Sequence, residues 1–227
     1  MGLFGFGKHK STPTPPPEPV TFNRQPASVA EPEGNEVFLD LNKGGILNLQ
    51  KNDFLNLTKT GVNLTDIRVS AGWDVNHRGQ DYDLDLCAYL LDGCNCVQDV
   101  VYYADKTAKG LQLDKDNLTG EGDGDDENIF VNFDKIDPTI NRIVFGVVIY
   151  KAASKGQSFK HVRNAYVRMV DQSVHPECEI CRYNLTEDGG SNTAVKFAEI
   201  VRTSEGWTFN AIGEYSKNTI SSLKAAL

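Results

Sequence analysis

Seven carboxylates fall within one short stretch of the chain, Asp114–Glu127, and a single lysine, Lys115, opposes them. The acids are Asp114, Asp116, Glu121, Asp123, Asp125, Asp126 and Glu127. Glycines alternate with them, and glycine lets the backbone bend sharply enough to bring carboxylates together. Two carboxylates about 5 Å apart repel by roughly 3 kcal/mol at an effective dielectric constant of about 20. The stretch is therefore interpreted as a loop that a cation orders, with a solvated acidic loop as the alternative.

A second row of acids lies in the segment Asp81–Leu91, whose alternating polar and apolar residues are typical of a β-strand. Successive side chains of a strand point to opposite faces, so Asp81, Asp83 and Asp85 are expected to share one face. Tyr82, Leu84 and Leu86 then share the other. An exposed polar face is the alternative reading, but a second acidic element nearby favours a shared cation. Hard oxygen ligands in a flexible loop suit Ca²⁺ better than the small, strictly octahedral Mg²⁺.

Known signatures of metal and nucleotide sites do not fit these segments. An EF-hand needs acids or Asn at loop positions 1, 3 and 5, Gly at 6 and Glu at 12, and no register of the acidic stretch supplies them. The chain contains no phosphate-binding loop, nucleophile elbow or His-Glu-x-x-His motif. So many acids around one place indicate cation ligation rather than a tuned acid–base pair. We expect a protein without enzymatic activity; a metal-dependent hydrolase, with His77 as its candidate base, is the alternative.

Two further groups of side chains are candidates for a site. One is a basic cluster that comprises Lys151, Lys155, Lys160, His161, Arg163 and Arg168. It would hold a phosphate-bearing ligand or an acidic partner, or it is ordinary solvated charge. The close pairs Cys94/Cys96 and Cys178/Cys181 would supply four thiolates to Zn²⁺, or are free thiols.

Composition limits the class of protein. The formal charge of −8 argues against a nucleic-acid binder. No apolar run approaches the roughly 20 residues of a membrane helix, and no secretory signal is evident, so a cytoplasmic location is expected. Residues 1–34 form an expected flexible, proline-rich and disordered tail. Its apolar and basic start would dock to a protein partner or peripherally to a membrane, which makes an adaptor a further alternative.

Residues 35–227 are expected to form one all-β domain. Short strands are predicted over 67–71, 81–91, 97–103, 129–133, 142–150, 165–170, 180–185, 194–202 and 207–211, with turn residues between them. The run Arg142–Tyr150 is apolar throughout, which is typical of a strand buried on both faces. Only Thr219–Leu227 looks helical. The pattern predicts an antiparallel β-sandwich with a short C-terminal helix.

Several of these segments, taken in order and spacing, resemble the TerD family of tellurium-resistance and stress proteins. The matching motifs are Gly72-Trp-Asp-Val-Asn76, Tyr82-Asp-Leu-Asp-Leu86, Val101-Tyr-Tyr103, Gly120-Glu-Gly-Asp-Gly-Asp-Asp-Glu127, Phe159-x-x-Val-x-Asn-Ala-Tyr-Val-Arg168, Cys181-Arg-Tyr183 and Gly206-Trp-Thr-Phe-Asn-Ala211. The resemblance extends over about residues 37–215 and does not include the tail or the paired cysteines.

The resemblance implies a β-sandwich that binds calcium through its acidic elements, with two ions expected. It implies ligands among Asp74, Asp83, Asp85, Asp116, Asn117, Asp123, Asp125, Asp126 and Glu127. It also implies a role in resistance to tellurite, chemical damage or phage, exerted through protein partners in a stress-response complex.

Overall fold

The computed structural model describes residues 34–38, 46–60, 64–74, 81–120, 124–185 and 189–227. The predicted tail lies almost wholly outside these ranges, and so do Asp123 and His77. Expectations for those residues remain predictions.

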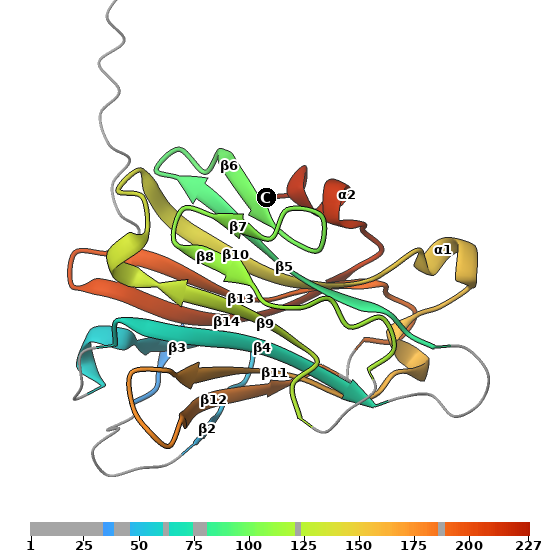
Figure 1. Ribbon diagram of the computed structural model, residues 1–227, viewed down its shortest axis with the longest axis horizontal. Coiled ribbons are helices and arrows are strands. Elements are labelled where there is room, and N and C mark those ends of the chain that lie inside the picture. Colours follow the sequence, from blue (N-terminus) through green and yellow to red (C-terminus); the bar gives the residue numbers. More distant parts are fainter. Residues whose placement is uncertain (1–33, 39–45, 61–63, 75–80, 121–123, 186–188) are drawn as a thin grey trace, which may run out of the picture.

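Two seven-stranded sheets make up the fold, and Figure 1 shows them stacked. The first sheet runs, in spatial order, β1 (Asn35–Glu36), β3 (Asp53–Asn56), β14 (Gly206–Ser216), β13 (Ala194–Thr203), β10 (Ile140–Ile149), β5 (Leu84–Asp92) and β6 (Val97–Val101). The second runs β2 (Leu47–Asn48), β12 (Cys178–Asn184), β11 (Arg163–Asp171), β4 (Asp66–Asp74), β9 (Glu127–Asn132), β8 (Leu111–Leu113) and β7 (Thr107–Ala108).

The predicted antiparallel β-sandwich is confirmed, with two local exceptions. The pairs β1–β3 and β2–β12 are parallel, but β1 and β2 are two-residue strands at the sheet edges. All other pairs are antiparallel. Because these edge strands are so short, the antiparallel pairing of the longer central strands determines the fold.

The main core lies between the sheets, and a smaller apolar cluster lies on the outer face of the first sheet. Strand β10 is buried along almost its whole length, as its continuous apolar sequence predicts. Its outward-facing Val144 and Val148 join Cys87, Tyr89 and Leu223 in the smaller cluster. Leu223 belongs to the C-terminal helix, so this helix covers the part of the sheet that a two-layer fold would otherwise leave exposed.

The C-terminal helix α2 (Ile220–Lys224) confirms the helical segment predicted over 219–227, although it is shorter. Thr219 caps it, with reciprocal hydrogen bonds to Ser222. The expectation that no other segment is helical was wrong, because one turn of α-helix, α1 (Ala152–Lys155), follows β10. Three 3₁₀ turns are also present: η1 (Leu57–Lys59), η2 (Phe133–Lys135) and η3 (Phe159–His161). No helix in the described residues is long and apolar enough to cross a membrane.

Candidate metal centre

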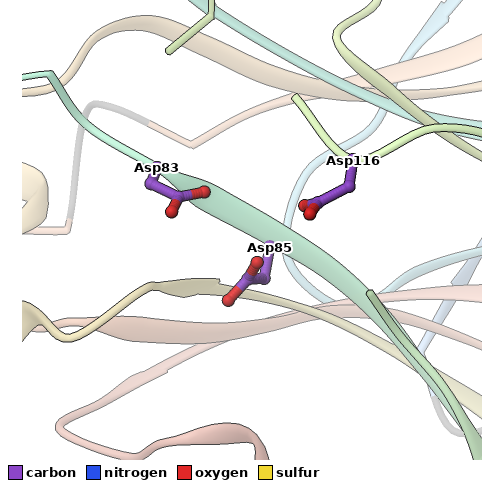
Figure 2. A group of neighbouring side chains, drawn as sticks. All are labelled: Asp83, Asp85 and Asp116. Carbon is purple, nitrogen blue, oxygen red and sulfur yellow. The ribbon is translucent and has the colours of Figure 1, made fainter. Parts of the chain in front are cut away.

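Three aspartates from two segments converge at the start of β5. Asp83 comes immediately before this strand and Asp85 lies on it, and Asp116 faces them from the loop that joins β8 to β9 (Figure 2). One carboxylate oxygen from each lies within 4.8 Å of the others. We call these residues the aspartate triad. The predicted arrangement, an acidic loop closing over an acidic strand, is what the structure has.

Strand alternation explains why the first two members share a face. Tyr82, Leu84 and Leu86 belong to the core between the sheets, so Asp83 and Asp85 must point the other way. Asp81 was expected in the same row. It lies before the strand begins, where its side chain is exposed, and it is outside the triad.

The triad concentrates negative charge, and two of its members are buried while Asp116 is more exposed. Asp83 is 6% exposed and Asp85 is 3% exposed. Burial, followed by the charges of Asp83 and Asp116, raises the pKa of Asp85 to about 8. Burial also raises the pKa of Asp83, while Lys155 partly offsets this and Asp116 adds to it. A bound cation would remove this repulsion.

Two oxygens of the triad are available for such a cation. Asp83 Oδ1 and Asp116 Oδ1 are buried and have no hydrogen-bond partner within the described part of the chain. Buried polar atoms are almost always paired, so two orphans in one cluster call for an explanation. Oxygens on one Ca²⁺ ion lie up to about 5 Å apart, given Ca–O distances of about 2.3–2.6 Å. The spread of the triad therefore fits a single calcium ion, with waters and backbone carbonyls to complete the coordination.

Asn117 holds the loop that carries Asp116. Its Oδ1 accepts hydrogen bonds from the amides of Thr119 and Gly120, and its Nδ2 donates to Asp126 Oδ1 at 2.7 Å. Gly120 has a φ of +71°, and a Cβ there would lie 2.4 Å from Trp73 Nε1. A larger residue would therefore push the loop away from the sandwich. Asn117 was predicted as a ligand, but here its side chain organises the loop.

Asp126 and Glu127 anchor the far end of the same loop through backbone amides. Asp126 Oδ2 accepts from Trp73 N at 2.9 Å, and Glu127 Oε2 accepts from Leu86 N at 2.7 Å. Strand β6 pairs with β5 only from Ala88 onward, so Leu86 N has no β6 partner and the Glu127 carboxylate takes that place. Burial is the main cause that raises the pKa of Glu127 to about 9. Glu127 borders the triad, since the charges of Asp85 and Asp116 act on it, and neither Asp126 nor Glu127 is a member of it.

Asp125 forms hydrogen bonds and ion pairs with a different group of side chains. Arg168 Nε and Nη2 each lie 2.8 Å from its two oxygens, Tyr166 donates to it at 3.0 Å, and Arg68 Nη1 lies 3.3 Å away. Burial raises the pKa of Asp125, but the hydrogen bonds and charge of Arg168 more than offset this and hold it below its ordinary value. The structure thus places Asp125 in an ion pair with β11 and not in the triad.

This pair yields a testable effect on stability. We expect Arg168→Met to lower the free energy of unfolding by about 3 kcal/mol, because it leaves the Asp125 carboxylate buried without its main partner. Arg168→Lys should lower the free energy of unfolding by less, since it keeps the charge and loses only the bidentate geometry. Urea denaturation measures both. Arg142→Met, which breaks the more exposed pair with Glu199 on the other sheet, is the control and should cost about 1 kcal/mol or less. Equal losses for Arg168→Met and Arg142→Met would contradict the assignment.

Of the two remaining predicted ligands, Asp74 lies outside the triad. Asp74 is exposed at the end of β4, where Oδ2 accepts a short hydrogen bond from Asn164 Nδ2. Asp123 lies outside the described residues, so its role as a ligand stays a prediction.

The cysteines do not assemble a zinc site in the structure. Cys94 and Cys96 are exposed at the turn between β5 and β6, whereas Cys178 and Cys181 lie on β12 in the other sheet. All five cysteines are free thiols. The aspartate triad is the only group with metal-ligand spacing among the residues that the structure describes.

Sequence reasoning overlooked two residues beside the triad. Lys155 was assigned to a basic cluster of its own, yet its charge acts on Asp83 and Asp85. Tyr103 borders the triad closely enough that, after burial, the charge of Asp85 contributes to raising its pKa. No local pattern in the sequence links Lys155 or Tyr103 to the acids, because both come near them only in the folded chain.

The sequence of this chain matches a known protein family. A sequence model described as the TerD domain matches residues 46–226, most of the chain. The chain belongs to the TerD family. The predicted resemblance is therefore confirmed.

Individual TerD-family relatives cover most of the sandwich. The chain is 42% identical over 174 residues to "Uncharacterized protein YceE" of Bacillus subtilis (strain 168), covering 74% of this chain and 90% of that protein. It is 37% identical to "Tellurium resistance protein TerD" of an Alcaligenes species, over 74% of this chain and 89% of that protein. It is also 37% identical to "General stress protein 16U" of B. subtilis (strain 168), with the same coverage.

A solved TerD homologue has the same fold. The crystal structure of a homologue of telluride resistance protein (TerD) from Streptomyces coelicolor A3(2) superposes with a TM-score of 0.62. The match covers 71% of this chain and 96% of that one at 21% identity. At this identity the likeness concerns the sandwich alone.

Proposed function

We propose that this protein is a non-enzymatic calcium-binding component of a stress response, in which one Ca²⁺ ion at the aspartate triad orders the acidic loop. The family supports the stress-response part, because relatives carry the names of tellurium-resistance and general stress proteins. The proposed calcium site has its main support in the two buried, unpartnered oxygens of Asp83 and Asp116.

Calcium is favoured over other common cations by the chemistry of the triad. The triad presents only carboxylates, without the imidazole or thiolate ligands that Zn²⁺ prefers. Mg²⁺ demands near-ideal octahedral geometry at about 2.1 Å and dehydrates reluctantly, whereas Ca²⁺ accepts carboxylates from a flexible loop in less regular geometry. A second ion, implied by the family resemblance, stays a prediction because Asp123 lies outside the described residues.

Calcium should raise the melting temperature. A ligand that binds only the folded state at about 100 times its dissociation constant adds about 2.7 kcal/mol, or roughly 5–10 °C for a domain of this size. Differential scanning calorimetry with calcium, with magnesium and with a chelator measures the shift, and isothermal titration calorimetry measures binding. Magnesium should shift the melting temperature far less. The absence of a calcium-specific heat signal in the titration would refute the proposed site.

We propose that the protein acts by binding other proteins when the loop is ordered, the role that its resemblance to the TerD stress proteins implies. Affinity purification of the full chain with and without calcium tests this. Partners that co-purify equally in both conditions would separate complex formation from the calcium site. Docking through residues 1–34 stays a separate prediction, which deletion of that segment would test.

A further inference from the structure

An open cavity of about 720 Å³ lies next to the aspartate triad. It is bounded by β6, β10, the segment around α1 and the segment that leads into α2. Figure 1 shows α2 beside β6 on the outer side of the first sheet. Asp85 lines the cavity, so the triad and the cavity share a wall. A volume of this size lies within the range of small-molecule binding sites, about 300–1,000 Å³.

Three tyrosines form an aromatic part of the wall. Tyr102 and Tyr103 pack edge to face with ring centroids 5.1 Å apart, and Tyr103 and Tyr150 do so at 5.6 Å. All three line the cavity and are half-buried. Such rings offer a flat ligand both face and edge contacts.

Three lysines supply positive charge from separate segments. Lys151 follows β10, Lys217 follows β14, and Lys224 ends α2. Lys151 Nζ lies 4.9 Å from the centre of the Tyr150 ring. No carboxylate in the described ranges lies within ion-pair distance of any of the three lysines. They are therefore available to an anion.

The charge balance of the cavity depends on the triad. The three lysines are matched by three lining carboxylates, those of Asp85, Asp99 and Asp105. Asp83 and Asp116 of the triad add two more negative charges nearby. A divalent cation at the triad would offset these two charges, so the cavity would attract an anion more strongly in the calcium-bound protein.

We propose that this cavity binds a small aromatic phosphate, whose phosphate group meets the bound cation at Asp85 and the lysines while its ring packs on the tyrosines. The inference rests on the proposed calcium site and adds a ligand to it. A phosphate has enough oxygens to reach the cation and several lysines at once, whereas a carboxylate has only two. Lysine binds phosphate as a point charge.

Phenyl phosphate is a suitable probe, titrated into the full chain by isothermal titration calorimetry after calcium binding has been measured on the same preparation. With saturating calcium we expect binding that weakens about tenfold or more in a chelator, since the cation is then absent. Methyl phosphate should bind about fivefold more weakly than phenyl phosphate, because it lacks the ring.

The double variant Lys217→Gln/Lys224→Gln should bind phenyl phosphate about tenfold more weakly and calcium unchanged. Lys135→Gln, an exposed lysine at the second sheet, is the matched control and should change neither. If calcium binds but phenyl phosphate does not, or the double variant matches the control, the inference is overturned and the calcium site stands. If calcium itself does not bind, the proposed function and this inference fall together.

Discussion

Asp85→Asn is expected to abolish the calcium-induced rise in melting temperature and to leave the ion-free protein at least as stable as the parent. Asp85 is 3% exposed and lies beside two other carboxylates, so in the absence of an ion its charge is unfavourable. Asparagine keeps the shape and removes that charge. A calcium ligand should lose the calcium-induced rise in melting temperature without losing stability in the ion-free form. Substitution of an ordinary structural residue would instead lower the stability with and without calcium.

The loss of calcium affinity should be large. Even at the dielectric constant of water, a divalent ion about 2.4 Å from a unit charge gains about 3 kcal/mol. Removing one carboxylate should therefore weaken binding about 100-fold or more. Isothermal titration calorimetry measures the affinity, and thermal scans in a chelator measure the stability of the ion-free form.

Asp114→Asn is the matched control for this variant. It removes the same charge from the same loop, but Asp114 is exposed and is outside the triad. We expect a change in calcium affinity of about threefold or less. A variant Asp85→Asn that still binds calcium like Asp114→Asn would exclude the triad as the site.

Without calcium, the protein should become less stable as the pH rises from about 4 to about 8. The folded protein holds protons on Asp85, with a pKa of about 8, and on Glu127, with a pKa of about 9. In the unfolded chain, ordinary carboxyl groups release their protons near pH 4. Because the folded state binds more protons in this window, the free energy of unfolding declines with pH, by an amount on the order of a few kcal/mol. Asp125 and Glu179, whose pKa values are lowered, act in the opposite direction only at more acidic pH.

Saturating calcium should remove most of this decline. The ion displaces the proton from Asp85 and stabilises its charged form, so calcium affinity itself rises with pH. Urea denaturation at pH 5, 6.5 and 8, with a chelator and with calcium, measures the effect. Asp85→Asn should show a shallower decline in the chelator, since one of the two groups is gone. A stability that rises with pH in the chelator would contradict the assigned protonation states.

The sequence predicted the fold and the shared face of Asp83 and Asp85, because both rest on local periodicity. Alternation along β5 determines that Asp83 and Asp85 share a face, and it places Leu84 and Leu86 in the core. The continuous apolar run of β10 predicted burial on both faces, although the covering element, Leu223 of α2, lies more than seventy residues away in the chain.

The selection of ligands within the acidic loop was beyond sequence reasoning. Asp116, Asp125 and Asp126 are chemically alike, and nothing local distinguishes them. What separates them is tertiary structure: Arg168 on β11 takes Asp125, and the Trp73 amide on β4 takes Asp126. Asp116 remains directed at β5 because Asn117, its neighbour, ties the loop to the start of β9.

The hydrogen bond from Leu86 N to Glu127 has a consequence for how the two layers sit on one another. Apolar packing between sheets is non-directional and tolerates small lateral shifts. Glu127 opens β9 in one sheet and accepts from the backbone of β5 in the other, a bond of fixed length and direction. It ties β9 to β5 at the edge where Asp83, Asp85 and Asp116 meet. The distance from Asp116 to the other two carboxylates therefore depends on how the two sheets are aligned.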